Sequence, residues 1–235
     1  MKFIAIIPAR GGSKGIPRKN IKLFNNKPLI SWTIKAAIDS NIFESVFVST
    51  DDLEISTISK AFGANVPFLR PRYLANDKAS TLSVVQHFLK KIYNKNSENY
   101  PFAVVILQPT SPLRTSLHIK SAVDLFKSNK DADSLVSCTQ VPHNFTPNSL
   151  MRLNRHGFLD FAKNMNKLIY RRQDKEKYIA RNGAAIYITK TNLLDKFILG
   201  GKILPYFMDF IDSVDIDEPR DWELAELIFK YRNNE

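Results

Sequence analysis

The sequence has little of what disulfide scaffolds, zinc sites and membrane spans are made from. Its one cysteine, Cys138, cannot form an intrachain disulfide, and its apolar surroundings favour a buried strand thiol over a nucleophile. No apolar run reaches the length of a membrane span, and the first residues enter a strand without a signal peptide, so we expect a cytoplasmic protein. The histidines show neither zinc spacing nor a Ser/His/Asp order, and we expect all of them to be structural: His87, His118, His143 and His156.

Glycine is also scarce, at eight of 235 residues, yet three glycines fall in one loop, residues 8–20. The loop follows an apolar run at 3–7 that predicts a strand buried on both faces. It matches neither GxxxxGKS/T nor GxGxxG, which excludes the usual ATPase loop and the dinucleotide fingerprint. Glycines let the backbone approach a ligand closely, and the same loop carries cations at Arg10, Lys14, Arg18 and Lys19. This combination predicts a triphosphate-binding loop, with a flexible basic loop as the alternative.

The net charge of +11 is distributed unevenly along the chain. Residues 1–38 hold eight Lys or Arg and no acid, whereas residues 209–235 hold nine Asp or Glu against three Lys or Arg. Nonspecific nucleic-acid binding would favour a basic stripe with exposed aromatics, but the aromatics here fall mostly inside apolar strand and helix patterns. A basic loop facing an acidic segment is better suited to a metal–triphosphate complex. A basic nucleic-acid-binding protein remains the alternative from a different class.

Strand and helix patterns alternate along most of the chain, which is long enough for one substantial core. This alternation predicts an α/β fold with a doubly wound, mostly parallel sheet whose ligands bind beyond the carboxyl ends of the strands. Asp51 and Asp52 follow a strand and are expected to cap the next helix. The predicted strands are 3–7, 45–50, 66–69, 102–107 and 134–139, and the predicted helices are 28–38, 51–62, 81–93, 116–128 and one from 219.

Residues 141–181 interrupt this alternation. Short alternating pieces at 150–153 and 158–161 predict a small antiparallel excursion, and 183–188 returns to the main sheet. We therefore divide the chain into a nucleotide-binding α/β domain, 1–140 with 182–235, and an excursion at 141–181. The excursion is apolar but too small to enclose a core, so we expect it to form a homodimer interface, with a covering helix from the same chain as the alternative.

Asp215 and Asp217 are separated by one residue in an extended segment, so their side chains share one face about 7 Å apart. Two carboxylates on one face repel unless a cation lies between them, and Mg²⁺ accepts one or two carboxylates while keeping positions for phosphate oxygens. The pair therefore predicts a magnesium–nucleotide site. The alternative is a solvated acidic turn in which Asp217 or Glu218 caps the last helix.

Five stretches, in order, resemble the acylneuraminate cytidylyltransferases, which activate nine-carbon sialic-type acids as CMP-sugars. They are IPARGGSKGIPRKN, LRPRYLANDKAST, LQPTSPLR, RRQD with NGAAIYI, and SVDIDEPRDWELAE, and they span residues 3 to about 226. The resemblance implies a Rossmann-like fold of the nucleotide-diphospho-sugar transferase type. It also implies a Mg²⁺-dependent transferase that moves CMP from CTP to the anomeric hydroxyl of a nonulosonic acid, releasing pyrophosphate. A CMP-Kdo-type or other sugar nucleotidyltransferase is the nearest alternative, and the acid itself (N-acetylneuraminic, legionaminic or pseudaminic) is left open.

The resemblance also assigns roles to residues. The catalytic residues would be Lys19, Arg10 and Asp217, and the metal ligands Asp215 and Asp217. The nucleotide contacts would be Arg10, Gly11, Ser13, Asn20, Arg70, Ser80, Thr81 and Gln108. The sugar contacts would be Gln108, Arg172, Gln173, Tyr187 and Arg181, of which Arg172 suits the sugar carboxylate. Without the resemblance, the arginines at 171 and 172 would be interpreted as a solvated charge run. Asn20 could likewise be the cap of a turn, and Arg70 a solvated loop residue.

Overall fold

The core of the chain is a seven-stranded sheet in a computed structural model that describes residues 1–147, 149–162, 171, 176–183 and 185–233. Its main path runs β11-β6-β10-β5-β1-β4, and β9 pairs with β6 off this path. Five of the strands run parallel to one another, while β9 and β10 are antiparallel to their neighbours. The strands are β1 (Phe3–Pro8), β4 (Ser45–Ser49), β5 (Ala103–Ile106), β6 (Ser134–Gln140), β9 (Ile179–Arg181), β10 (Tyr187–Lys190) and β11 (Ile203–Phe207).

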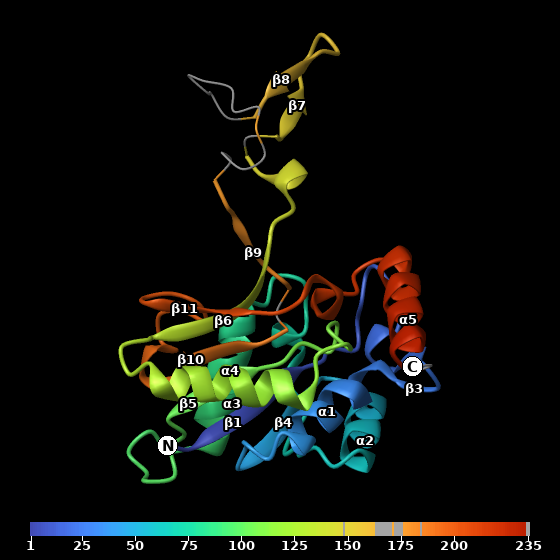
Figure 1. Cartoon of the computed structure of the whole chain (residues 1–235). Coiled ribbons are helices and arrows are strands. Elements are labelled where there is room, and N and C mark those ends of the chain that lie inside the picture. Colours follow the sequence, from blue (N-terminus) through green and yellow to red (C-terminus); the bar gives the residue numbers. More distant parts are fainter. Residues whose placement is uncertain (148, 163–170, 172–175, 184, 234–235) are drawn as a thin grey trace.

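Helices cover both faces of this sheet, as the predicted doubly wound fold requires (Figure 1). On one face, apolar side chains of α1, α2 and α4 pack on the strands, including Ile34, Ile55 and Ile119. On the other face, α3 contributes Val85 and Phe88 to a second core cluster. The α/β prediction is therefore confirmed. The helices are α1 (Leu29–Asp39), α2 (Leu53–Ala61), α3 (Thr81–Ile92), α4 (Ser116–Ser128) and α5 (Pro219–Asn233).

A third, aromatic cluster fixes the last helix against the first. Phe24 follows the basic loop in the small hairpin of β2 (Leu23–Phe24) and β3 (Lys27–Pro28), and its ring packs edge-on against Trp222 of α5 at 5.7 Å. Trp32 of α1 and Phe229 of α5 also meet edge to face, with ring centroids 4.6 Å apart. Buried aromatic pairs of this kind contribute about 0.5–1.5 kcal/mol each beyond their area. The cluster thereby brings the acidic C-terminal segment next to the basic N-terminal loop.

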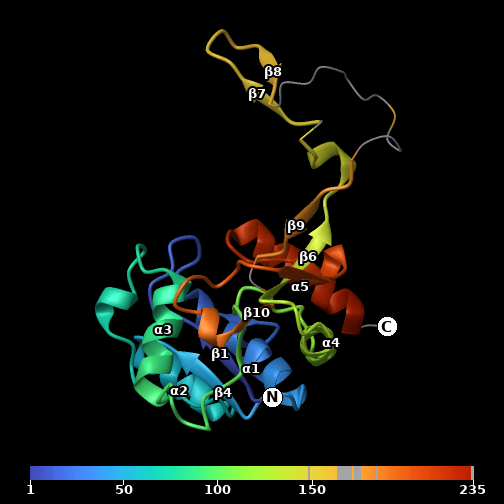
Figure 2. The same ribbon diagram turned by 90° about the vertical axis from the view of Figure 1, so that its left-hand side faces the viewer.

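The excursion predicted from the sequence projects away from the sheet (Figures 1 and 2). It contains an antiparallel hairpin of β7 (Met151–Leu153) and β8 (Leu159–Phe161), and every residue of both strands is exposed. The stem is formed where β6 pairs with β9. The predicted antiparallel pieces are therefore confirmed, while the domain boundaries stay a prediction.

Two parts of the sheet were predicted wrongly. Residues 66–69 are not a strand, because Pro67 cannot donate to a ladder and only Asn65 forms an isolated bridge, to Phe47. The edge strand β11 was missed because Pro205 lies inside it, and proline is tolerated only at such edges. None of the helices among the described residues has the length and apolar character needed to cross a membrane.

Candidate functional site

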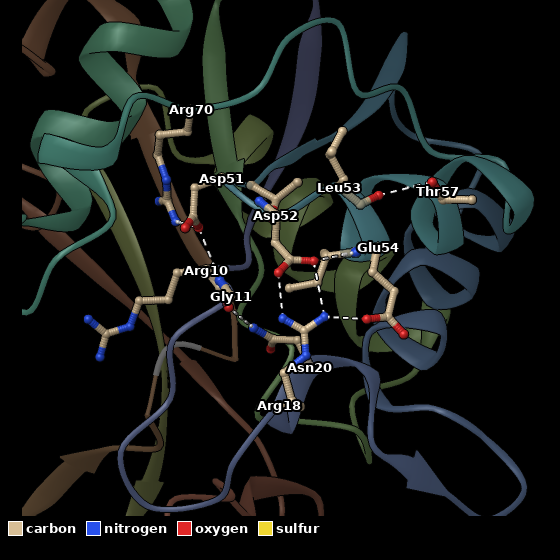
Figure 3. A network of polar contacts seen from close by, with 12 residues as sticks. Arg10, Gly11, Arg18, Asn20, Asp51, Asp52, Leu53, Glu54, Thr57 and Arg70 are labelled. Carbon is tan, nitrogen blue, oxygen red and sulfur yellow. Dashed lines mark hydrogen bonds and ion pairs between the residues drawn. The ribbon is translucent and has the colours of Figure 1, made fainter.

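The loop of residues 9–20 leaves the carboxyl end of β1 and is fastened to the neighbouring strand β4 (Figure 3). The N–H of Gly11 donates to Asp51 Oδ1 at 3.0 Å, just beyond the end of β4. Asn20 Nδ2 donates to the carbonyl of Arg10 at 3.0 Å and so holds the two ends of the loop together. Asp51 was expected to cap α2 but instead binds the loop, because its carboxylate faces the Gly11 N–H.

Arg18 fastens the same loop to the start of α2. Its guanidinium makes a two-point ion pair with Asp52 and a further ion pair with Glu54 at 2.5 Å (Figure 3). Asp52 also caps α2 by accepting a hydrogen bond from the N–H of Ile55 at 2.9 Å, which confirms its predicted role. The Arg18 guanidinium holds the pKa of the Asp52 carboxyl below its usual value. Arg18 thus holds the loop against α2 and lines neither of the two pockets described below.

A cavity of about 220 Å³, here called the basic pocket, opens between the loop and α3. Arg70 is 6% exposed, and its Nη2 lies 3.8 Å from Asp51 Oδ1. Burial lowers the pKa of Arg70, and Asp51 opposes that shift. Because this ion pair is long, the Arg70 guanidinium can also bind a second anion. The lining includes Pro8, Arg10, Arg70, Thr81, Val84 and Gln108.

Asp77 also lines the basic pocket and forms ion pairs with two cations of the loop, Arg10 and Lys14. Its two carboxylate oxygens lie 2.8 Å from Arg10 Nη1 and 2.8 Å from Lys14 Nζ. Lys14 and then Arg10 lower the pKa of Asp77. Two cations of the predicted phosphate-binding loop therefore share one carboxylate of the same chain, which offsets one of their two charges.

A second and wider cavity of about 600 Å³, here called the acidic pocket, adjoins the first. Gln108, two residues beyond the end of β5, lines both pockets and so marks the boundary between them. Arg181 Nη1 donates to the Tyr187 hydroxyl at 3.4 Å, and that hydroxyl donates to the carbonyl of Gly183 at 3.1 Å. The lining is Gln108, Thr110, Arg181, Gly183, Tyr187, Asp215 and Asp217.

Asp215 and Asp217 face this acidic pocket from the extended segment before α5. Burial raises the pKa of Asp215, a hydrogen bond with Thr110 opposes that rise, and the charge of Asp217 adds to it. Asp215 Oδ1 is buried and has no hydrogen-bond partner within the part of the chain that the structure describes. The Ile216 N–H donates to the carbonyl of Thr110 at 2.8 Å, which fixes the segment against residues 108–114. A buried carboxylate next to a second one is a natural position for a cation.

The residues fit a magnesium site of the nucleotide type. Across the described ranges, no group of three or more His, Cys, Asp or Glu side chains is placed to hold a metal. Mg²⁺ at nucleotide sites uses one or two carboxylates and completes its coordination with phosphate oxygens and water, so a larger cage is not required. Asp215, with its unpartnered buried oxygen, and Asp217 are the residues that would hold it.

Lys19 connects the basic loop to the acidic segment. Its Nζ donates to the carbonyl of Ile216 at 2.5 Å and to Asp217 Oδ1 at 3.1 Å, although 198 residues separate the lysine from the aspartate. Gly15 lies so close that a Cβ there would be 2.1 Å from the carbonyl oxygen of Asp217. Gly183 has φ +67, and a Cβ there would be 2.4 Å from Asp215 Oδ2. Glycine at both positions is therefore required for the contact of these segments.

The structure brings most of the predicted residues together. Arg10, Arg70, Thr81 and Gln108 meet in the basic pocket, and Gln108, Tyr187, Arg181, Asp215 and Asp217 meet in the acidic pocket, with Lys19 against Asp217. Ser80 instead caps α3, with its hydroxyl accepting from the N–H of Ser83 at 3.1 Å. The Gly11 N–H donates to Asp51, Asn20 binds within the loop, and Ser13 lies in the loop outside both linings. Arg172 and Gln173 lie outside the described residues.

Three residues in or next to the site were not singled out from the sequence: Asp77 and Thr110, which line the pockets, and Arg114, which lies behind them. Each lies inside a quoted motif, but its partner comes from a distant part of the chain. The sequence offered one signal, since arginine in an apolar turn such as Ser111-Pro112-Leu113-Arg114 is a candidate for burial. Motif position alone does not identify which carbonyls such an arginine binds.

The sequence matches a family model described as cytidylyltransferase over residues 4–226. An N-acylneuraminate cytidylyltransferase of Escherichia coli is 39% identical over all of this chain and 54% of its own length. A CMP-N,N'-diacetyllegionaminic acid synthase of Legionella pneumophila is 34% identical over 98% of this chain and 97% of its own length. The chain thus spans about half the length of the E. coli relative and of an N-acylneuraminate cytidylyltransferase A of Danio rerio, which is 37% identical over 94% of this chain and of which 49% is covered.

Solved structures share the fold at lower identity. A CMP:2-keto-3-deoxy-manno-octonic acid synthetase in complex with CTP has a TM-score of 0.71 at 16% identity, covering 99% of this chain and all of that one. A cytidylyltransferase from Leptospira borgpetersenii has a TM-score of 0.60 at 20% identity, covering 99% and 96% of the two chains. At these identities the likeness establishes the α/β fold, with its mixed, mostly parallel sheet.

Proposed function

The chain belongs to the cytidylyltransferase family, and from that premise we propose that it transfers CMP from CTP to the anomeric hydroxyl of a sialic-type nonulosonic acid. The observation that carries the proposal is the pair of adjoining pockets that share Gln108, one basic and one with two carboxylates. A nucleoside triphosphate needs cations and a metal, and its acceptor must reach the α-phosphate from the opposite side. Relatives named for N-acylneuraminic and legionaminic acids support the class of the acceptor.

In this proposal the basic pocket binds the nucleotide. Its cations are Arg10 and Arg70, of which Arg70 is buried and has a long ion pair with Asp51. Thr81 and Gln108 supply neutral polar groups. The acidic pocket takes the sugar, with Tyr187 and Arg181 on its wall. A guanidinium suits the carboxylate of the acid because it binds both oxygens at once. Arg172 and Gln173 remain sugar contacts by prediction.

The reaction is an in-line displacement. The anomeric oxygen forms a bond to the α-phosphorus, the bond from that phosphorus to the bridging oxygen breaks, its electron pair leaves with pyrophosphate, and the hydroxyl proton passes to water. Lys19 is held 3.1 Å from Asp217 Oδ1, where its charge stabilises negative charge that develops on the phosphate. A bound Mg²⁺ at Asp215 and Asp217 would neutralise phosphate charge and lower the pKa of an attacking hydroxyl. The remaining task of the protein is to position the two substrates and to exclude water from the site.

The test is pyrophosphate release with CTP and a panel of acids: N-acetylneuraminic, legionaminic, pseudaminic and Kdo. We expect turnover with a nonulosonic acid and CTP, and slower turnover with ATP, GTP or UTP. Equal rates with UTP would remove the cytidine preference, and turnover with Kdo alone would favour the eight-carbon acceptor of the structural relative. Chelation of Mg²⁺ with EDTA should stop turnover, and addition of excess Mg²⁺ should restore it.

Lys19→Ala tests the catalytic assignment separately. We expect kcat to fall about 100-fold, the scale of one lost transition-state donor, with a smaller rise in the KM for CTP. A large rise in KM at unchanged kcat would make Lys19 a binding residue only. Nucleic-acid binding, the rival from another class, predicts instead an affinity for DNA that falls steeply with salt and no stabilisation by CTP.

We also propose that the excursion forms a homodimer interface. Its exposed apolar side chains, including Leu153 at 71% and Phe158 at 71%, cannot form a core of their own and need cover. The alternative of a covering helix from the same chain has no support among the described residues, where the hairpin pairs only with itself. Cytoplasmic location, expected from the sequence, stays a prediction.

A further inference from the structure

Arg114 is a buried cation whose partners are carbonyls rather than a carboxylate. It is 2% exposed, and within the described ranges no Asp or Glu forms an ion pair with it. Its Nη1 donates to the carbonyls of Ala185 at 2.7 Å and Gln108 at 3.1 Å, and its Nη2 donates to Thr33 Oγ1 at 2.6 Å. Burial lowers its pKa to about 9. A buried charge without an opposite charge is costly, so its retention here calls for a role.

The two carbonyls belong to the strands that bound the site. β5 and β10 are antiparallel neighbours, and their last paired residues at this end are Ile106 and Tyr187. Two steps further along the same register, Gln108 would face Ala185. The strands part there, and one nitrogen of Arg114 binds both carbonyls in place of the ladder. The guanidinium therefore links β5 and β10 at the gap beyond their last paired residues, next to the pockets.

The two sides of that gap have different places in the site. Gln108 lies on the wall that the basic and acidic pockets share, while Gly183 and Tyr187, on either side of Ala185, line the acidic pocket and not the basic one. Arg114 itself lines neither of these two pockets. A change at Arg114 would thus alter the distance between the two walls without removing a contact from either.

We propose that Arg114 is a positioning residue that fixes the nucleotide side of the site against the sugar side, an inference that rests on the proposed function. It acts through the carbonyls of Gln108 and Ala185, and not through substrate. Displacement of one bound reactant by about 1 Å can reduce a rate about 100-fold while each reactant still binds. Arg114 should therefore affect kcat far more than the affinity for either substrate.

The test compares Arg114→Met and Arg114→Lys with Val123→Ala, a control in the α4 core that removes buried volume away from the site. We expect kcat to fall about 100-fold for Arg114→Met and about tenfold for Arg114→Lys, which keeps a donor for one or both carbonyls. The KM for CTP, and the dissociation constant of CTP measured by calorimetry, should change less than about threefold. Val123→Ala should lose Tm with kcat within about twofold of the wild type.

The outcomes separate the two proposals. A wild type that neither binds CTP nor turns over would overturn the proposed function. If the wild type is active and Arg114→Met keeps its kcat, or loses activity only in proportion to Tm as Val123→Ala does, the positioning role is wrong. Arg114→Lys decides the question if the methionine variant does not fold. Failure of both variants to fold would also overturn the inference, because Arg114 would then be required for the fold as a whole.

Discussion

Asp77 forms ion pairs with Arg10 and Lys14, the two cations that we expect to bind the triphosphate. Arg10 and Lys14 are both 2.8 Å from it, so a triphosphate that binds this loop must compete with Asp77 for them. Exposed ion pairs are individually weak, and we therefore expect Asp77→Asn to lower the KM for CTP only about threefold at low ionic strength. Asp39→Asn, which breaks the exposed pair with Lys35 on α1, is the matched control and should leave KM unchanged.

Steady-state kinetics at two salt concentrations measure this effect, which should shrink as salt rises. A higher KM for Asp77→Asn would show the reverse relation, in which Asp77 contacts the nucleotide itself. Inorganic triphosphate gives a second readout that does not depend on turnover, because it should raise the Tm of Asp77→Asn more than that of the wild type.

Asp215, the proposed metal ligand, carries a charge that should reduce stability when no cation is bound. Its burial and the neighbouring Asp217 both raise its pKa, so its ionised form is disfavoured in the fold without a cation. Asp215→Asn should therefore keep or raise the Tm in EDTA while turnover falls more than about 100-fold. A matching loss of Tm and activity would mean that Asp215 holds the fold and not the metal. Asp217→Asn should lose activity comparably.

Several residues that line the two pockets could be singled out from the sequence, but their mutual contacts could not. Asp215 and Asp217 were singled out because alternation in an extended segment places both on one face, and both line the acidic pocket. The pairing of Asp77 with Arg10, and the double contact of Arg114 with Gln108 and Ala185, depend on how distant segments pack. No local pattern carries that information, since side-chain direction in a loop follows from its tertiary partners.

The basic loop has two anchors on β4 and α2, the first at Gly11 and the second at Arg18. Arg18→Ala removes the second anchor, and we expect a Tm loss of about 2–4 °C at pH 7, the equivalent of about 1 kcal/mol after allowance for solvent screening. The pKa of Asp52 is lowered from 3.8, first of all by its hydrogen bond with Arg18. The stabilisation is therefore present above about pH 3.8 and is lost as the pH falls through the lowered pKa.

Thermal unfolding of wild type and Arg18→Ala at a series of pH values tests this directly. The difference in Tm should be constant from neutral pH down to about 5 and should narrow below the ordinary carboxyl pKa. Lys35→Ala, which removes an exposed helical pair, should change Tm much less. A difference that persists unchanged in strong acid would mean that Arg18 stabilises the loop through packing alone.

At the level of elements, prediction succeeded where burial and periodicity agree. The buried strands β1, β4, β5 and β6 and all the long helices follow the expected ranges closely. The failures at 66–69 and at β11 have one cause, since each segment combines β-favouring residues with a proline. Whether such a segment joins a sheet depends on whether the proline nitrogen faces solvent at an edge, which only the assembled sheet determines.

For the whole molecule, the exposed apolar hairpin predicts that two copies of the chain associate. Sedimentation velocity at assay concentration should give a dimer, and Phe158→Glu with Leu153→Glu, two exposed positions of the hairpin, should shift it toward monomer without lowering Tm of the core. A fully active monomer would contradict the prediction that a dimer is required.

A mixing experiment examines whether the two subunits share a site. Lys19→Ala and Arg181→Ala proteins, each expected to be inactive, are combined under conditions that exchange subunits. Partial recovery of activity would support a site completed by the partner, whereas none, with heterodimers demonstrated, would confine the site to one chain.

The contact of Lys19 with Asp217 also sets the order in which the protein can mature during its synthesis. Lys19 is synthesised 198 residues before Asp217, so most of the sheet can form before the two segments meet. Until then the acidic partners of the loop's cations, among the described residues, are Asp52, Glu54 and Asp77. A nascent chain that has not yet reached residue 215 lacks the carboxylate pair. In the proposed function, competence for CMP transfer therefore arrives in a single late step rather than growing with chain length.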